Sequence, residues 1–300
     1  MEKIEILDLH FQDAESTIGS FLISGPDGPV LVETGPESTW PHLKAGLKTH
    51  GFEPEDIRAV LLTHIHFDHA GAAWRLAEAG TDIYVHPLGL PHLANPERLW
   101  RSAAQIYGEE MDRLWGKMAP IPSGQLKAPG DKEILRVGGM DFRAWYTPGH
   151  AVHHIAWQLD DILFTGDVAG VKIGSGPVVP PCPPPDIHLE DWKKSLELIG
   201  KINPKALYLT HYGVVEDIST HLQNLRIIMD DWAKWMKKQY DLRTPVEDII
   251  PQFMAYTEMQ MKEKGVDGEL NALYEHANPS WMSVNGLLRY WKLKDQGRIP

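Results

Sequence analysis

Four side chains that can bind a metal ion crowd into residues 63–71, Thr-His-Ile-His-Phe-Asp-His-Ala-Gly. The apolar run before them predicts a buried strand, and the residues after them predict a turn into a helix. Side chains two apart on a strand point the same way, so His64 and His66 can bind one ion. The turn can direct Asp68 and His69 toward a neighbouring point. Imidazoles with a carboxylate suit Zn²⁺, Fe²⁺ or Mn²⁺.

The alternative interpretation is that these are solvent-exposed histidines at a strand end, which is common for a single histidine. Three further segments argue against it, because each places a ligand-type residue just after a predicted strand. Ligands gather at the carboxyl ends of strands in layered α/β folds, so all four segments can converge on one pocket. The three segments are Thr147-Pro148-Gly149-His150, Thr165-Gly166-Asp167 and Leu209-Thr210-His211-Tyr212-Gly213.

Alternating and continuous apolar patterns predict two strand-rich blocks with interleaved helices, which indicates an α/β fold. After the last strand, the sequence from about residue 216 is helical, and we expect Pro245, Pro251 and Pro279 to divide it into separate helices. The expected strands are residues 4–9, 18–24, 29–33, 57–63, 82–85, 141–146, 155–159, 162–164 and 206–210, and the expected helices are residues 38–50, 70–79 and 189–200.

Residues 95–118 form a separate helical pattern whose apolar side chains are spaced as one stripe. This stripe either packs as ordinary core or covers the pocket. We expect a catalytic domain at 1–215 with a helical, lid-like insertion at 95–118, and a helical C-terminal extension at 216–300 packed on the core. The chain contains 11 tryptophans, several of them in these two regions, which offer apolar surface for a roof or a homodimer interface.

Composition excludes several classes of function. A formal charge of −12 without a Lys or Arg run argues against nucleic acid as a partner. No stretch reaches the roughly 18 apolar residues of a membrane span, so we expect no membrane partner. The first residues lack the layout of a secretory signal, and Cys182 is the only cysteine, so a cytoplasmic location is expected.

The ordered motifs from about residue 5 to 215 resemble those of the metallo-β-lactamase superfamily. This resemblance implies an αββα sandwich with a two-metal site at one edge. Zinc is the first expectation for both ions, with iron or manganese as alternatives. The resemblance assigns His64, His66 and His150 to the first metal, Asp68, His69 and His211 to the second, and Asp167 to a bridge between them.

Two metals flanking one water would supply a bridging hydroxide near neutral pH. Asp68 is expected to orient this hydroxide and to pass the hydroxide's proton to the leaving group.

Glu33 stands where family members commonly carry Asp. It can orient a ligand histidine, or it is a surface carboxylate before a turn. His153, His154 and Tyr212 can contact a ligand or the substrate, although buried histidines and a packed tyrosine are the commoner outcomes.

The motif at 64–71 is similar to those of glyoxalase II-like thioesterases and of acyl-homoserine lactonases. We therefore expect hydrolysis of an ester-like bond, a lactone, carboxylic ester or thioester, in a small molecule with an apolar group. Three alternatives stay open: an iron-dependent, sulfur dioxygenase-like oxidoreductase of the same fold, a phosphodiester hydrolase, and a metal-stabilised binding module.

Overall fold

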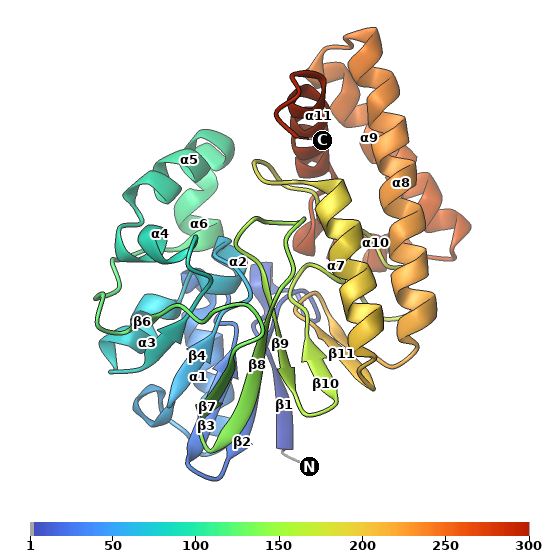
Figure 1. Cartoon of the computed structure of the whole chain (residues 1–300). Helices are drawn as coiled ribbons and strands as arrows, with labels where there is room; N and C mark the ends of the chain where they lie inside the picture. The colour runs from blue at the N-terminus through green and yellow to red at the C-terminus, as the bar shows by residue number, and fades with distance from the viewer. Residues whose placement is uncertain (1–2, 300) are drawn as a thin grey trace.

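Two six-stranded β-sheets lie face to face at the centre of the structure, a computed structural model that describes residues 3–299 (Figure 1). In the first sheet, β1 to β3 pair antiparallel and β3 to β6 pair parallel. Its strands, in spatial order, are β1 (Lys3–Asp8), β2 (Gly19–Gly25), β3 (Gly28–Val32), β4 (Ala59–Leu61), β5 (Asp82–Tyr84) and β6 (Leu126–Lys127).

The second sheet is antiparallel except for the parallel pair β10 and β11. Its spatial order is β12 (Gly213–Val215), β11 (Ala206–Leu209), β10 (Ile162–Phe164), β9 (Ile155–Leu159), β8 (Met140–Tyr146) and β7 (Ile134–Val137). Phe21 and Phe164, from opposite sheets, have ring centroids 5.2 Å apart. The two sheets therefore share one apolar core.

Alternation along each strand places apolar side chains on both faces of the first sheet. Phe21 and Ile23 of β2 point into the core between the sheets, whereas Leu22 points to the helices outside. Three-ten turns and short helices cover this outer face. They are η1 (Phe11–Asp13), η2 (Glu37–Thr39), α1 (Trp40–Thr49), η3 (Pro54–Asp56), α2 (Phe67–Ala70), α3 (Ala73–Glu78) and α4 (Leu90–Ala94).

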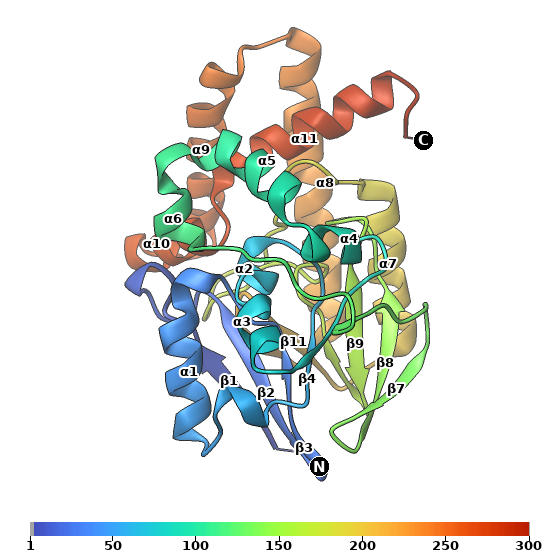
Figure 2. The ribbon, with the colours of Figure 1, turned by 90° about the vertical axis from the view of Figure 1, so that its left-hand side faces the viewer.

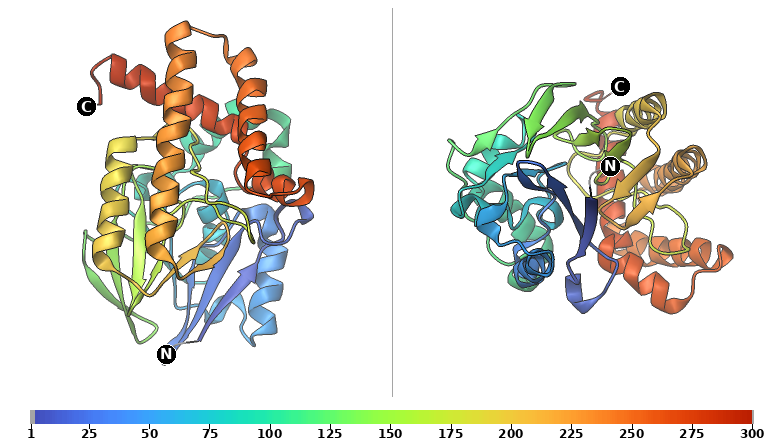
Figure 3. Two further views of the ribbon diagram at one scale, coloured as in Figure 1. Left: turned by 90° about the vertical axis from the view of Figure 1, so that its right-hand side faces the viewer. Right: turned by 90° about the horizontal axis from the view of Figure 1, so that it is seen from below.

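Longer helices cover the outer face of the second sheet, so the layers run helix, sheet, sheet, helix (Figure 3). Trp192 of α7 and Leu225 of α8 are buried against Leu163 and Leu207 of this sheet. The expected αββα sandwich is confirmed. The helices on this face are α7 (Leu189–Ile202) and α8 (Ile218–Leu242), and the remaining helices α9 (Val246–Glu263), α10 (Gly268–Ala277) and α11 (Ser280–Asp295) pack with them in the same apolar cluster (Figure 1).

The expected helical segment at 95–118 forms α5 (Glu97–Tyr107), η4 (Gly108–Glu110) and α6 (Met111–Trp115). In the chain, these elements stand between β5 and β6. Figure 2 shows α5 on the same side of the sheets as α11, at the end opposite the β2–β3 turn. Ala103, Met111 and Trp115 anchor the segment in the core that also contains α1 and α3.

The prediction that Pro251 separates two helices is wrong, because Pro251 lies inside α9. It is exposed there, so the helix loses one backbone donor but buries no unpaired group. The short elements α4, β6 and β12 were also not expected. The strand β12 pairs with β11, and the helical tail begins after it at Ile218.

Within residues 3–299, no helix has both the length and the apolar composition for crossing a bilayer.

Candidate metal centre

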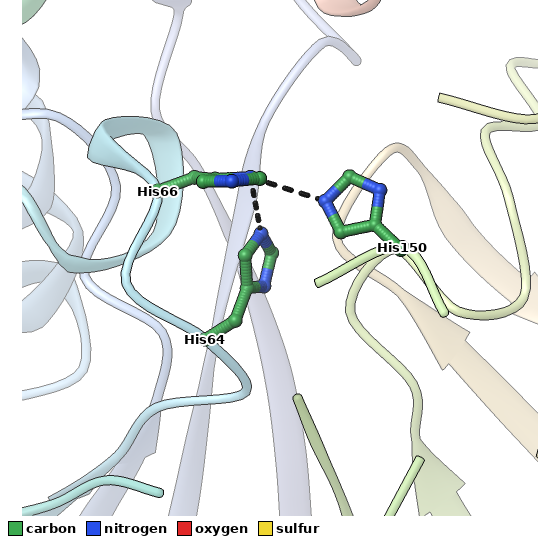
Figure 4. A group of neighbouring side chains, drawn as sticks. All are labelled: His64, His66 and His150. Carbon is green, nitrogen blue, oxygen red and sulfur yellow. Dashed lines mark hydrogen bonds between the residues drawn. The ribbon is translucent and has the colours of Figure 1, made fainter. Parts of the chain in front are cut away.

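Three histidines from two segments of the chain converge at the edge of the two sheets (Figure 4). His64 follows β4, His66 immediately precedes α2, and His150 lies in the turn between β8 and β9. His66 Nδ1 is 2.9 Å from His64 Nε2 and 3.1 Å from His150 Nε2. Ligand nitrogens around a tetrahedral zinc ion stand about 3.3 Å apart, so this first group has the spacing of a metal site.

A second group joins Asp68 and His69 of α2 with Asp167, which follows β10, and His211, which follows β11. His69 Nε2 lies 3.3 Å from Asp167 Oδ1, and His211 Nε2 lies 3.3 Å from Asp68 Oδ2. The other oxygen of Asp167, Oδ2, lies 3.3 Å from His150 Nε2 in the first group. Asp167 therefore faces both groups with different oxygen atoms.

Two glycines allow the backbone to bring these segments together. A Cβ at Gly166, whose φ is +47°, would lie 2.3 Å from Thr63 Oγ1. At Gly149, whose φ is +139°, it would lie 2.2 Å from Trp192 Cα. Both conformations favour glycine, and both contacts exclude a side chain. The residues just before Asp167 and His150 are therefore fixed by backbone geometry.

Two histidines of the cluster, His150 and His211, are held through Nδ1 by backbone carbonyl groups. His150 Nδ1 donates to Pro181 O at 2.9 Å, and His211 Nδ1 donates to Thr17 O at 2.7 Å. A neutral imidazole that donates through Nδ1 presents a lone pair on Nε2. His69 Nε2, His211 Nε2 and Asp167 Oδ1 are buried without a hydrogen-bond partner. Orphaned buried acceptors of this kind fit metal coordination.

The electrostatics of the first group favour neutral imidazoles. Burial, followed by the charge of His150, lowers the pKa of His66 to about 3. Burial also lowers the pKa of His64 well below its ordinary value, and lowers that of His150. Because only the neutral ring can donate a lone pair to a metal, these three side chains are in the binding form at neutral pH.

The second group carries the negative charge of the site. Burial opposes ionisation of Asp68, but His69 and His211 outweigh it and lower the pKa of its carboxyl to about 2. Burial likewise opposes a charge on His69, yet Asp167 and Asp68 raise the pKa of His69 well above its ordinary value. A nearby positive charge stabilises these buried carboxylates, and a bound divalent cation would supply it.

Glu33 supports the second group from behind. It is fully buried, so the interpretation of Glu33 as a surface carboxylate is wrong. Its Oε1 lies 3.2 Å from His69 Nδ1 and also accepts a short hydrogen bond from the Thr63 hydroxyl. Its backbone is left-handed, with φ of +67°, and the carbonyl accepts a hydrogen bond from Ser20 Oγ at 2.8 Å.

The other three predicted contact residues lie at different depths. His153 lines the cavity beside the cluster, and its Nε2 is 3.8 Å from Asp186 Oδ2. His154 is fully buried behind His64, with ring centroids 5.1 Å apart, and is hydrogen-bonded to Thr147. Tyr212 is outside the cavity lining and donates to Asp8 Oδ2 at 3.2 Å. We therefore place only His153 where a substrate can reach it.

A cavity of about 880 Å³ opens beside the cluster and is lined by His66, Asp68 and Asp167. Its walls are mainly apolar and come from α5, α6, the proline-rich loop and the link between α10 and α11. Asp186 and Tyr107 in these walls were not predicted as site residues. The Pro-Pro-Pro-Asp ending of the loop is the one local signal for Asp186. Tyr107 belongs to the stripe of apolar residues at 95–118, and its spacing does not distinguish it from a packed core residue.

Residues 18–211 match the sequence model of the Metallo-beta-lactamase superfamily. The chain belongs to this superfamily. The match begins just before β2, includes both halves of the cluster and the segment 95–118, and ends at His211. Membership and the His/Asp cluster together make this edge of the metallo-β-lactamase sandwich a site suited to metal binding.

Of three relatives of this chain, one carries only the name of the fold and two carry the names of hydrolases. The chain is 30% identical over 172 residues to the metallo-beta-lactamase fold-containing protein ST1585 of Sulfurisphaera tokodaii, covering 55% of this chain and 65% of that protein. It is 30% identical over 198 residues to the atrochrysone carboxyl ACP thioesterase of Aspergillus fumigatus, covering 65% and 50%. A hydroxyacylglutathione hydrolase of Klebsiella pneumoniae is 28% identical over 41% of this chain and 36% of its own length.

These matches span about half to two thirds of the first two relatives' length. Solved structures agree in fold over nearly the whole chain. The archaeal ST1585 structure has a TM-score of 0.63 at 20% identity and covers 96% of this chain and 98% of its own. The metallo-beta-lactamase family protein TTHA1429 from Thermus thermophilus has a TM-score of 0.66 at 20% identity and covers 98% and 94%.

Proposed function

We propose that this protein is a dinuclear metal-dependent hydrolase that cleaves an ester-like bond in a small molecule. One observation carries the proposal. Seven side chains of the types that ligate metals form two adjacent groups, and the carboxylate of Asp167 faces both of them at the floor of an apolar cavity. Such a cavity with a few convergent polar groups is the usual form of a small-molecule site.

Thioesters and carboxylic esters are the substrates that we favour, with lactones as cyclic esters of the same chemistry. The names of two relatives, a thioesterase and a hydroxyacylglutathione hydrolase, support this preference. The cavity wall supports it as well, because an acyl group can pack on apolar side chains while its carbonyl reaches the cluster.

The residues present fit two divalent ions, and we name zinc first, with manganese or iron as alternatives. When bound, two such ions lower the pKa of a water between them from about 15.7 toward 7 and polarise the substrate carbonyl. We assign one ion to His64, His66 and His150, and the other to Asp68, His69 and His211, with Asp167 shared.

Asp68 is the side chain of the cluster that can move a proton. Its carboxylate is partly open to the cavity, whereas the histidines of its group are almost fully buried. Hydrolysis adds the oxygen of water to the acyl carbon and breaks the bond from that carbon to sulfur or oxygen. Asp68 accepts the proton released by the attacking water and passes it to the leaving sulfur or oxygen.

The helices above the cluster exclude bulk water and bind the acyl group. We propose that residues 95–118 form a lid-like insertion of a catalytic domain at 1–215, and that 216–300 form an extension completing the roof. Leu99 and Trp115 from the insertion and Trp281 from the extension line the same cavity, which supports this division.

The experiment that tests the proposed function is a substrate screen of purified protein loaded in turn with Zn²⁺, Mn²⁺ and Fe²⁺. We expect hydrolysis of aryl esters, lactones or acyl thioesters, and none of it after metal removal. Asp68→Asn should keep a protein-bound metal but lose turnover by about 100-fold or more. Oxygen uptake on persulfides with one iron per chain, or hydrolysis limited to phosphodiesters, would contradict the proposal.

A further inference from the structure

The hydroxyl of Tyr107 has an unusual partner for a half-buried polar group. Tyr107 is the last residue of α5 and lines the cavity beside the metal-binding cluster. Its O–H donates to the sulfur of Met282, at 3.1 Å, across the cavity roof. A thioether is a weak acceptor, so this hydrogen bond satisfies the hydroxyl poorly. An oxygen atom in the cavity would be a stronger acceptor for the same proton.

Aromatic neighbours fix the direction of this hydroxyl. The Tyr107 ring packs edge-on against Trp115, with centroids 5.1 Å apart, and against Trp281, with centroids 6.3 Å apart. Trp115 belongs to α6, whereas Trp281 belongs to α11, so the ring is held from both sides of the roof. A donor held in this way loses little conformational entropy when a ligand binds.

Tyr107 is also a donor that keeps its proton. Burial, and then the negative charge of Asp68, raise the pKa of Tyr107 well above its ordinary value. Tyr107 and Asp68 line the same cavity. A neutral hydroxyl there can donate to an uncharged acceptor near the cluster without the cost of burying a charge.

We propose that Tyr107 is a substrate-binding residue whose hydroxyl leaves Met282 and donates a hydrogen bond to the carbonyl oxygen of an aromatic acyl group. The acyl group packs on the aromatic wall formed by Trp115 and Trp281. The assignment rests on the proposed function for the identity of the carbonyl, and it adds the residue that recognises it. The competing account is that Tyr107 and Met282 form only a packing contact between the insertion and the extension.

Ligand binding separates the two accounts without any need for turnover. The probe is 2-acetonaphthone, which presents an aryl carbonyl but has no bond that hydrolysis can cleave, and naphthalene is its oxygen-free control. Binding to the zinc-loaded full chain is measured by calorimetry. We expect Tyr107→Phe to bind the ketone about tenfold more weakly than the unmodified protein, the value of one hydrogen bond, and to bind naphthalene equally well.

Met282→Leu is the matched variant, because it removes the weak acceptor and keeps the hydroxyl. We expect it to bind the ketone at least as tightly as the unmodified protein does. Equal losses in Tyr107→Phe and Met282→Leu, equal ketone binding by Tyr107→Phe and the unmodified protein, or no ketone binding at all would each overturn the assignment.

The outcome also separates this inference from the proposed function. A protein that binds the ketone through Tyr107 yet hydrolyses no ester or thioester retains the inference and refutes the hydrolase. A protein that hydrolyses aromatic acyl esters with the same kcat and KM in Tyr107→Phe retains the hydrolase and refutes the inference. Zinc content measured on the same samples should be equal in all variants.

Discussion

The Nδ1 atom of His69 lies 3.2 Å from Oε1 of Glu33, and both side chains are fully excluded from solvent. Nε2 of the same ring lies 3.3 Å from Asp167 Oδ1. Glu33 therefore holds the ring from behind and presents its other nitrogen to the cluster. Carboxylates that orient a ligand histidine in this way raise its basicity and determine which nitrogen faces the metal.

Glu33→Gln should weaken metal binding at the second group. The amide keeps the shape of the carboxylate but loses its charge, so we expect a fall in affinity of about 10- to 100-fold at that group. Chelator competition with zinc measures the change. Glu37→Gln is the control, because Glu37 pairs with Arg75 outside the cluster. Equal zinc affinities in Glu33→Gln and the control would show that Glu33 has no role in the site.

Removing one histidine from either group should remove one metal ion from the protein. We expect His66→Ala and His211→Ala each to retain about one zinc per chain where the unmodified protein holds about two, because each contributes to a different group. Elemental analysis of protein dialysed against a weak chelator gives the ratio. Full metal content in both variants, or the loss of all metal from both, would contradict two separate groups that share Asp167.

The cavity wall should control affinity for bulky acyl groups. Trp281→Ala removes an aromatic side chain from the lining, and we expect KM for naphthyl esters to rise by about five- to tenfold with little change for acetyl esters. Trp291→Ala is the matched control on the same helix, because Trp291 packs away from the cavity and donates to Ala233 O. It should lower stability, by up to about 3 kcal/mol, without changing KM. The same rise in KM from both substitutions would indicate that loss of packing in α11 raises KM, and it would contradict a specific role of Trp281 in the cavity wall.

His86 should make the zinc-loaded protein less stable in mild acid. Burial lowers the pKa of His86 to about 4, compared with 6.5 in the unfolded chain. Between these values the unfolded chain binds a proton that the folded protein does not, so stability falls as the pH drops from about 6.5 to about 4. His86→Gln should flatten that slope by up to about 1.4 kcal/mol per pH unit. Denaturant titrations at several pH values test this, and parallel curves for the two proteins would refute it.

The spacing of apolar residues predicts a helix or strand well where the element packs between other layers of the fold. The strands β2 and β3 and the helix α7 follow the predicted residues closely, because their apolar period matches the layers on both sides. The strand β12 has three residues and only one paired neighbour, which is too short a pattern to read. The helix α9 continues through Pro251 because an exposed proline near the start of a long helix costs a single backbone hydrogen bond.

The predicted ligand residues lie together because each follows a strand, and strand ends are visible in sequence. The sequence therefore predicts the convergence of His64 with His150, and the two histidines lie in one group. The residues above the cluster were less accessible to prediction. Tyr107 and Met282 are 175 positions apart in the chain, and their contact depends on how α5 and α11 meet. The spacing of apolar residues within one helix does not predict which distant helix it will contact.

Zinc titration of metal-free protein, with thioester hydrolysis followed at each addition, tests the central claim most directly. Because the two groups share Asp167 and open to one cavity, we predict no activity without metal and full activity at about two zinc ions per chain. Activity in the metal-free protein, or no hydrolysis of any ester or thioester at any zinc content, would contradict the account.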